Sequence, residues 1–303
     1  MKIAVFHRLS FGDTELRLNE EAEKLGIKLV WIKYRQLRLD NEKIFFEETD
    51  LADFDGWYFR AVGSELEWSK LLSMYAKKYG VRVIDEYILN EGVLRRFKSV
   101  MSWQLLNAAI PYPKSSFVNT LADLKEELEK WQFPLIVKLS SGGRHGMGTF
   151  FLKSMEDFIE LKRKLNLRAE EEKKEKGFSI LRRGFLIQEF IENDGDYRVM
   201  TVGYKCVGGF KRQPKVEKII FNQSVGKSLG LKKVPSDVAE IAEKAARILE
   251  VEVAGTDLVR SKKDGKVYLI EVNEAPQFKV FEKRTGINVA KEILKYAENK
   301  FKK

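Results

Sequence analysis

The chain has 303 residues, of which 44% are hydrophobic and 33% charged, and its formal net charge is +10. This length suffices for two or three modules with a hydrophobic core, and no apolar run approaches the roughly 20 residues that a membrane-spanning helix requires. A single cysteine, Cys206, excludes an intramolecular disulfide framework, and the presence of only two histidines argues against histidine-rich metal sites and most catalytic triads.

The charge excess allows two interpretations. Basic side chains could attract a polyanion such as ATP or a nucleic acid, whereas mixed charges along amphipathic helices could keep the surface solvated. We expect the solvated surface, because both signs are mixed throughout and no nucleic-acid-recognition motif is present. The first strand-like stretch opens at Met1 without a leader-like segment, which predicts a cytoplasmic location and no membrane partner.

Residues 1–90 are predicted to form an N-terminal α/β domain. Short buried-strand patterns alternate with helical stretches, which is typical of a parallel sheet with connecting helices. The predicted strands are Lys2–Phe6, Leu29–Ile32, Gly56–Phe59 and Val81–Ile84.

Residues 91–182 are predicted to form a central subdomain, which contains a glycine-rich turn between two strands. Its predicted elements are a helix over 97–107, strands Leu135–Leu139 and Thr149–Leu152, and a helix over 156–165. Pro111 and Pro113 separate the first helix from the strands. We interpret the charge-dense run 168–176 as a helix end and a solvated loop.

Residues 183–303 are predicted to form a C-terminal subdomain. Its predicted elements are strands Phe185–Phe190, Tyr197–Val202 and Cys206–Lys211, a helix over Asp237–Leu249, and two further strands that carry polar residues. A closing helix would place Val289, Ile293 and Leu294 on one face.

The glycine-rich turn directly follows the strand that ends in Lys138. Its glycines are Gly142, Gly143, Gly146 and Gly148. Glycines allow backbone N–H groups to close on phosphate oxygens, although a plain flexible hairpin would have the same composition. Lys138 favours the phosphate interpretation, because a lysine in an apolar strand is costly to bury unless it meets an anion. The alternative is a strand-end lysine that reaches solvent.

The segment Gln188–Ile191 ends a buried strand and could hold a nucleotide base. Backbone groups would meet the base edge while apolar side chains line the pocket, although an ordinary strand end would have a similar sequence. Arg198 and Arg212 follow on later strands, and either guanidinium could stabilise phosphoryl charge or form a surface ion pair.

Asp257, Glu271 and Asn273 are predicted magnesium ligands. Residues i and i+2 of a strand share a face, so the oxygens of Glu271 and Asn273 would converge while Ile270 and Val272 turn into the core. Such a sparse set of hard oxygen ligands is typical of magnesium held together with nucleotide phosphates. The alternative is a strand with edge polar residues followed by a turn.

The order of these motifs resembles the ATP-grasp superfamily of carboxylate-amine ligases. Within it, the chain is most similar to the RimK-like group, which includes ribosomal-protein glutamate ligases. The N-terminal Arg60-Ala61-Val62-Gly63 and the later Thr285-Gly286-Ile287 add to the resemblance. It implies a small N-terminal parallel-sheet α/β domain followed by two α+β subdomains that sandwich ATP.

Carried over residue by residue, the resemblance implies these roles. Lys98 and Lys138 would contact ATP phosphates under the glycine flap, and Asp196 would lie near the ribose. Glu189, Phe190 and Ile191 would hold adenine, Arg212 and Asn222 would be catalytic, and Asp257, Glu271 and Asn273 would bind Mg²⁺ or Mn²⁺. Ile219–Phe221 and Gln223–Lys227 depart from the arginine and the Arg-Gly-Gly pattern common in the group, which leaves the acceptor open.

We therefore predict an ATP- and magnesium-dependent ligase that forms an amide bond through an acyl-phosphate. It would add glutamate or another amino acid to a peptide, a protein C-terminus or a small carboxylate. Arg60, Lys279 or Arg284 could hold a substrate carboxylate, or each could be a surface residue. The alternatives are a dipeptide or glutathione-like synthetase, a nucleotide-binding regulator without ligase activity, and a basic nucleic-acid-binding protein. The oligomeric state is left open, with a homo-oligomer allowed.

Overall fold

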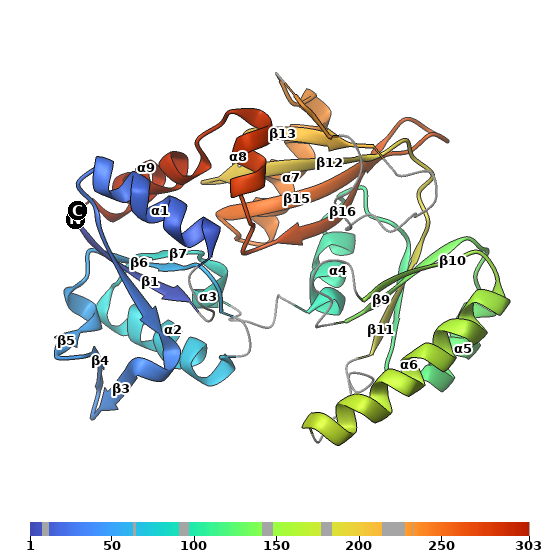
Figure 1. Ribbon diagram of the computed structural model, residues 1–303, viewed down its shortest axis with the longest axis horizontal. Coiled ribbons are helices and arrows are strands. Elements are labelled where there is room, and N and C mark those ends of the chain that lie inside the picture. Colours follow the sequence, from blue (N-terminus) through green and yellow to red (C-terminus); the bar gives the residue numbers. More distant parts are fainter. Residues whose placement is uncertain are drawn as a thin grey trace.

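The computed structural model describes residues 1–7, 12–62, 65–90, 97–140, 148–176, 184–213, 228–231 and 233–302. Figure 1 shows these residues arranged around a parallel N-terminal sheet, a central sheet and a C-terminal sheet, with helices packed on each. Within the described ranges, no helix combines the length and the apolar character needed to cross a membrane.

The N-terminal sheet is parallel, with strand order β2-β1-β6-β7. Because side chains alternate along β1, Ala4 and Phe6 pack on the α2 side while Ile3 and Val5 pack on the α1 side. The elements of this unit are β1 (Lys2–His7), α1 (Asp13–Lys24), β2 (Lys28–Lys33), β6 (Gly56–Phe59), α2 (Leu66–Tyr79), β7 (Val83–Ile84) and α3 (Tyr87–Asn90). A small antiparallel sheet, which the sequence patterns did not indicate, contains β3 (Leu37–Asp40), β4 (Lys43–Phe46) and β5 (Thr49–Asp50).

The central sheet is antiparallel, with strand order β10-β9-β11-β8. Its elements are α4 (Lys98–Asn107), β8 (Ser115–Val118), α5 (Leu121–Leu128), β9 (Leu135–Leu139), β10 (Thr149–Leu152), α6 (Met155–Lys176) and β11 (Phe185–Glu189). The run 168–176 was predicted to be a helix end followed by a solvated loop. The helix part of this prediction is confirmed and the loop part was wrong, because α6 continues to Lys176. This run is rich in Ala, Glu, Lys and Arg, which have high helix propensity, and so its charge density marked a solvated helix.

The C-terminal sheet is also antiparallel, with strand order β14-β13-β12-β15-β16. Its strands are β12 (Asp196–Val202), β13 (Lys205–Arg212), β14 (Ser228–Gly230), β15 (Val253–Arg260) and β16 (Val267–Asn273). The helices of this part of the chain are α7 (Ser236–Ile248), α8 (Lys279–Thr285) and α9 (Val289–Phe301).

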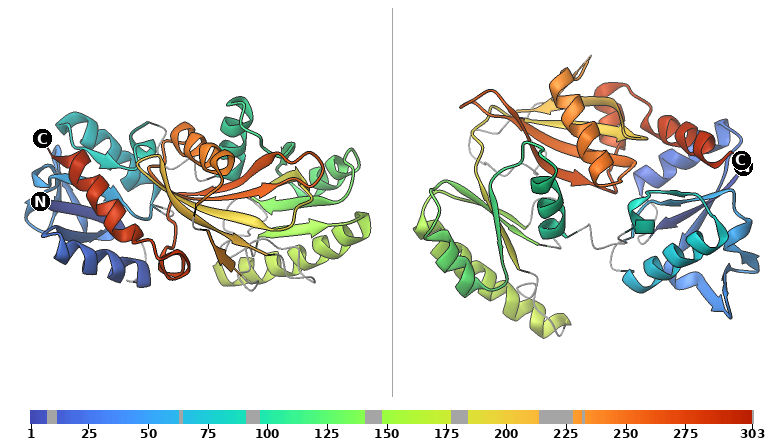
Figure 2. Two further views of the ribbon diagram at one scale, coloured as in Figure 1. Left: turned by 90° about the horizontal axis from the view of Figure 1, so that it is seen from above. Right: turned by 180° about the vertical axis from the view of Figure 1, so that it is seen from behind.

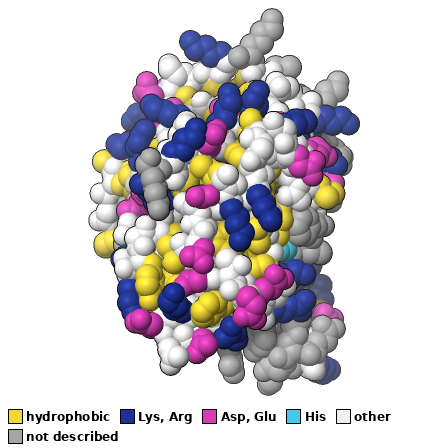
Figure 3. All heavy atoms as spheres, turned by 90° about the vertical axis from the view of Figure 1, so that its left-hand side faces the viewer, with side chains coloured by type: hydrophobic (Ala, Val, Ile, Leu, Met, Phe, Trp, Pro, Cys, Tyr) yellow, Lys and Arg dark blue, Asp and Glu magenta, His cyan; other side chains and the backbone are white. Residues whose placement is uncertain are grey.

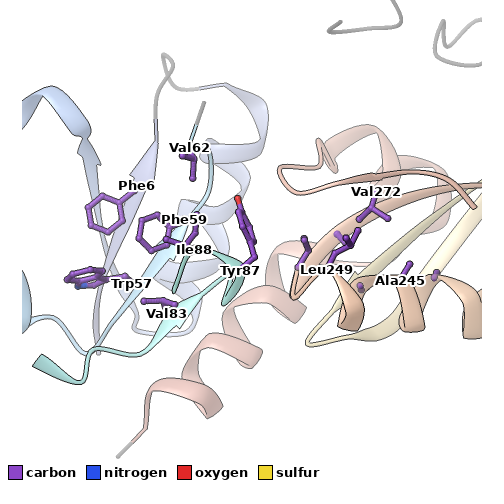
Figure 4. Close-up of a cluster of buried hydrophobic side chains, with 14 of the residues drawn as sticks. Phe6, Trp57, Phe59, Val62, Val83, Tyr87, Ile88, Ala245, Leu249 and Val272 are labelled. Carbon is purple, nitrogen blue, oxygen red and sulfur yellow. The ribbon is translucent and has the colours of Figure 1, made fainter. Parts of the chain in front are cut away.

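One hydrophobic cluster joins the N-terminal and C-terminal units. Figure 4 shows Tyr87 of α3 between the aromatic side chains of the N-terminal sheet and a group from the C-terminal unit that includes Ala245, Leu249 and Val272. The central sheet has a separate core, in which α5 and α6 pack on β9 and β11. The N-terminal and C-terminal units are therefore packed together as one body.

The last helix of the chain packs on the first sheet. Ile293, Leu294, Ala297 and Phe301 of α9 share a buried cluster with Ile3 and Val5 of β1, and the two termini lie at the same end of the molecule (Figure 2). Val289, Ile293 and Leu294 are all buried, which confirms the predicted apolar face of this helix.

The predicted domain ranges, 1–90, 91–182 and 183–303, stay a prediction, and two observations bear on how they would be drawn. The range 183–303 would include β11, whose hydrogen bonds place it in the central sheet. It would also include α9, which covers one face of the N-terminal sheet. Units defined by packing are therefore not contiguous in the sequence.

The charged side chains of both signs are interspersed on the face shown in Figure 3. Some charged side chains form ion pairs, such as exposed Lys78 with exposed Glu42, and exposed Lys43 with the largely buried Asp50. This pattern is that of a solvated surface, in which exposed ion pairs contribute little to stability.

Candidate functional site

A pocket of about 600 Å³ lies between the central sheet and the C-terminal sheet. The predicted site residues that line it are Lys138, Glu189, Phe190, Ile191, Asp196, Asp257 and Glu271. They come from β9, β11, β12, β15 and β16 and from the segment that joins β11 to β12. A mostly apolar pocket with a few convergent charges is typical of a small-molecule site.

Two lysines stand at the charged end of the pocket. Lys138 on β9 is buried, and its Nζ donates to the carbonyl of Ile270 at 3.4 Å. The pKa of Lys138 is lowered to about 8, mainly by burial and to a smaller extent by nearby Lys98, while the Glu271 carboxylate acts in the opposite direction. Lys98, at the start of α4, lies 3.5 Å from Glu271. This part of the pocket is therefore suited to a ligand that brings additional negative charge.

An alternating ion network occupies the facing wall. The Nε of Arg212 donates to Asp196 at 2.7 Å, and its Nη2 donates to Asp257 at 2.7 Å and also contacts Asp196. Arg198 donates to the other oxygen of Asp257 at 2.9 Å. Opposite residues of antiparallel strands share a face, and the register pairs Asp196 with Arg212 and Arg198 with Asp257.

Burial and ion pairing act against each other in this network. Burial raises the pKa of Asp196 to about 6, although the Arg212 guanidinium lowers it. Burial alone would lower the pKa of Arg212, but the carboxylates of Asp257 and Asp196 outweigh it, so the pKa is raised. Arg212 is therefore charged, and it pairs with two buried carboxylates, of which Asp257 also pairs with Arg198.

The predicted magnesium ligands lie on neighbouring strands in register. Asp257 pairs with Glu271, and Gly255 pairs with Asn273, whose Nδ2 donates to the Gly255 carbonyl at 3.2 Å. Among the described residues, no group of three His, Cys, Asp or Glu side chains could hold a metal. The predicted set instead has two carboxylates and an amide oxygen, which fits a hard cation that takes its remaining ligands from phosphates.

A β-bulge corrects one part of the strand prediction. The pairing of β15 with β16 shifts between Asp257 and Leu258, so that Ile270 becomes an extra residue on β16. Val272 turns into the core as expected, but Ile270 lines the pocket beside Glu271. A strict alternation of side chains along β16 predicted the wrong face for Ile270, because no residue pattern in the sequence indicates the bulge.

The predicted base-binding segment forms the apolar end of the pocket. Phe190 packs edge-on against Phe151 of β10, with ring centroids 4.8 Å apart. Glu189 exchanges hydrogen bonds with the backbone of Lys114, and Asn193 closes a turn by donating to the carbonyl of Ile191 at 2.6 Å. These bonds fix the course of the chain between the two sheets.

Several predicted site residues are placed elsewhere or lie outside the described ranges. Gly142, Gly143, Gly146 and Asn222 lie outside the residues that the structure describes. Gly148 is buried, and its carbonyl accepts from the Leu139 backbone N–H at 2.8 Å. The proposed roles of the glycine flap and of Asn222 therefore stay predictions.

The three candidate substrate residues do not line this pocket. Arg60 is 2% exposed and donates to the carbonyl of Pro276 at 3.2 Å. Lys279 pairs with Asp13 at 2.7 Å, and the Arg284 guanidinium lies 4.9 Å from the centroid of the Phe210 ring. All three lie where the N-terminal unit or α8 packs against the C-terminal sheet, and each already has a partner.

Sequence reasoning missed part of the pocket lining. The missed residues are Pro113, Ile136, Thr149, Asn193, Val259 and Ile270. Ile136 lies two residues before Lys138, and Val259 lies two residues after Asp257, so strand periodicity could have identified both. Pro113 and Thr149 come from segments that only the tertiary fold brings to the pocket.

The chain is similar to known proteins along its whole length. A family model described as the RimK-like ATP-grasp domain matches residues 96–297. A "Probable alpha-L-glutamate ligase" of Legionella pneumophila strain Corby is 28% identical over 311 residues, which cover 100% of this chain and 97% of the relative.

Solved structures share the fold at lower identity. The ATP-grasp ligase PsnB complexed with minimal precursor, Mg and ADP has a TM-score of 0.71 at 15% identity and covers 99% of this chain and 98% of its own. An ATP-grasp RimK domain protein from Sphaerobacter thermophilus has a TM-score of 0.67 at 15% identity, covering 98% of this chain and 99% of its own. The predicted fold class is thereby confirmed, and the family match spans well over half of the sequence. The chain therefore belongs to the RimK-like ATP-grasp family of carboxylate-amine ligases, which use ATP.

Proposed function

We propose that this protein uses Mg²⁺ and ATP to activate a carboxylate as an acyl-phosphate and to join it to an amino acid, with glutamate as the first candidate. The observation that carries the proposal is the composition of one pocket. An apolar end, the buried Lys138 and several carboxylates line it. Three further basic side chains stand behind this lining, where they pair with its carboxylates: Lys98 with Glu271, Arg198 with Asp257, and Arg212 with Asp196 and Asp257.

The apolar end suits the adenine base. Ile136, Phe190 and Val259 would contact its faces, while the backbone beside Glu189 would meet its edge. Lys98 and Lys138 stand at the other end, where the phosphates would lie. The pocket thus has the polarity of a nucleotide, with an uncharged end and an end that attracts anions.

Asp257, Glu271 and Asn273 would hold the magnesium ion. Bound there with ATP, the ion would neutralise phosphate charge and orient the γ-phosphate. Arg212 already pairs with Asp196 and Asp257, and we propose that its guanidinium is shared between these carboxylates and a phosphoryl oxygen.

The reaction needs positioning more than a protein nucleophile. A carboxylate oxygen of one substrate would attack the γ-phosphorus of ATP and release ADP, and the amine of the other would then attack the acyl carbon and release phosphate. The cationic side chains would stabilise the transferred phosphoryl group and hold the reactants together. This demand agrees with a chain that has one cysteine and two histidines.

The choice of glutamate rests on the names of the relatives. The similar proteins from Legionella pneumophila and Aliivibrio fischeri are named probable alpha-L-glutamate ligases. A peptide carboxylate is our first candidate for the acceptor, since the structural neighbour PsnB is described in complexes with its precursor peptide.

Nucleotide product analysis tests the proposal. Purified protein would receive Mg²⁺, ATP, glutamate and a set of glutamate-terminated peptides, and ADP would be separated from AMP by chromatography. We expect ADP and phosphate to form only when both organic substrates are present. AMP and pyrophosphate would instead indicate adenylation and would refute the acyl-phosphate mechanism.

A panel in which the peptides are replaced by single amino acids or small carboxylates separates the substrate classes. ADP formation with small carboxylates alone would overturn the peptide acceptor in favour of a small-molecule synthetase. Tight ATP binding without ADP formation across the whole panel would favour the nucleotide-binding regulator.

A further inference from the structure

Arg198 is held against the predicted magnesium ligand Asp257. The two residues are directly opposite in the antiparallel pair of β12 and β15, and Nη1 of Arg198 donates to Oδ2 of Asp257 at 2.9 Å. Their side chains are 15% and 7% exposed. The other carboxylate oxygen, Oδ1, accepts from Arg212, which also binds Asp196. Each oxygen of Asp257 is thus assigned to a different guanidinium.

A glycine makes room for this arrangement. A Cβ added to Gly255 would lie 2.6 Å from Nη2 and 2.9 Å from Cζ of Arg198, and 2.9 Å from Cβ of Pro276. Gly255 is within β15 and is not among the glycines with a left-handed backbone, so any residue could adopt its conformation. What this position requires is the absence of a side chain, because the Arg198 guanidinium lies across its Cα.

The same glycine also contacts a second predicted ligand. The Gly255 carbonyl accepts the Asn273 amide at 3.2 Å, and the two residues are paired in the sheet. Gly255 precedes Asp257 by two residues on one strand, so it lies on the same face of the sheet. Gly255 therefore lies beside the Arg198 guanidinium, the Asp257 side chain and the Asn273 amide.

We propose that Arg198 is a positioning residue that fixes the orientation of Asp257 for metal–nucleotide binding. Gly255, which has no side chain, leaves the space that the Arg198 guanidinium occupies. The inference rests on the magnesium site of the proposed function. The planar guanidinium of Arg198 lies against Gly255 and donates to Asp257, and it thereby imposes one orientation on the Asp257 carboxylate. Arg212 is shared with Asp196 and can turn toward a phosphate, whereas Arg198 keeps Asp257 in place.

Two variants displace the guanidinium in different ways. Gly255→Ala keeps every charged group but places a methyl group where the Arg198 guanidinium lies. Arg198→Lys keeps the positive charge but removes the planar guanidinium. Gly56→Ala is the control for the first, because its Cβ on β6 would crowd only the ring of Phe301, in the N-terminal unit and away from Arg198. Arg260→Lys is the control for the second, since Arg260 is also on β15 and pairs with Asp237 at 2.8 Å.

The readout is ADP affinity, measured by calorimetry in EDTA and again with excess MnCl₂. We expect Mn²⁺ to tighten ADP binding to the unmodified protein and to both controls. The readout is compared as the factor by which Mn²⁺ tightens ADP binding. In the two test variants, this factor should fall about ten-fold, as it does when other groups that orient a metal ligand are changed, while ADP affinity in EDTA stays within about two-fold of that of the unmodified protein. Thermal melting of all variants would accompany these titrations.

The other outcomes each overturn a defined statement. An unchanged Mn²⁺ gain in both test variants would refute the positioning role alone. A parallel loss of ADP affinity in EDTA with a lower melting temperature would show that Arg198 and Gly255 only stabilise the fold. If Mn²⁺ has no effect on the unmodified protein, then the magnesium site of the proposed function fails, and this inference fails with it.

Discussion

Substitution of Lys138 by Met should change both the stability of the protein and the pH dependence of nucleotide binding. The lysine is buried between the two sheets, and burial lowers its pKa to about 8. A lysine in the unfolded chain has a pKa near 10.4, so the folded state disfavours the charged form. An incoming phosphate would oppose this preference, because it would add negative charge to that of Glu271 near the lysine.

The size of each effect follows from these pKa values. Suppose that ADP binds only the protein in which Lys138 is protonated. With a pKa of about 8, the fraction of protein in this form falls from about nine-tenths at pH 7 to about one-tenth at pH 9, so the apparent ADP affinity weakens about ten-fold. For stability, the unfolded state binds more protons between pH 8 and 10.4, so the contribution of Lys138 to stability rises with pH across that window. The shift of roughly two pKa units corresponds to about 3 kcal/mol.

Two titrations measure these effects. ADP affinity would be recorded from pH 7 to 9.5 in EDTA, so that no divalent ion alters the field at Lys138. Urea unfolding of the free protein and of Lys138→Met would be compared at pH 7 and pH 10. We expect Lys138→Met to bind ADP weakly at every pH, and to be the more stable protein at pH 7 by an amount that shrinks toward pH 10.

Substitution of Lys153, which is exposed just beyond β10, provides the control. Lys153→Met should follow the unmodified protein in both titrations. A ten-fold loss of ADP affinity at pH 9 that persists in Lys138→Met would refute the assignment of the pH step to Lys138. A stability difference that stays constant from pH 7 to 10 would refute the lowered pKa itself.

Three further substitutions probe the metal site, the ion network and the C-terminal helix. Asn273→Ala should abolish metal-dependent ADP formation without unfolding the protein, and full activity with an unchanged melting temperature would eliminate this residue as a ligand. Arg212→Met would leave Asp196 and Asp257 without their shared guanidinium, and we expect urea unfolding to show a loss of about 3–5 kcal/mol at pH 8 that shrinks as Asp196 is protonated below pH 6. Phe301→Ala should cost about 3–5 kcal/mol in the same assay because the ring is buried against Gly56, and a cost below 1 kcal/mol would show that the end of α9 contributes little.

The sequence predicted most strands well because their burial follows simple patterns. Leu135–Leu139 and Thr149–Leu152 have the predicted bounds, since short apolar runs between turn residues leave little choice of boundary. The loop part of the prediction for 168–176 was wrong because a polar helix and a polar loop share a composition, and helix propensity decided between them.

Local patterns also found the polar residues of the site but not their partners. Asp257 and Glu271 could be predicted from spacing along strands, whereas Arg198 became a partner of Asp257 only through the register of two strands distant in sequence. The bulge at Ile270 and the space beside Gly255 likewise follow from how the strands are paired. Such features depend on tertiary structure, and a single sequence does not reveal them.

The packing of α9 on β1 has a consequence for how the chain is made in the cell. During synthesis, the N-terminal sheet emerges before α9, whose residues cover part of one of its apolar faces. Domains that are contiguous in sequence can complete folding while the rest of the chain is still being translated. Here the nascent N-terminal sheet must wait, with Ile3 and Val5 incompletely covered, until the C-terminal helix leaves the ribosome. The contact between β1 and α9 is therefore a long-range one in the sequence, and contacts of this kind favour slow folding.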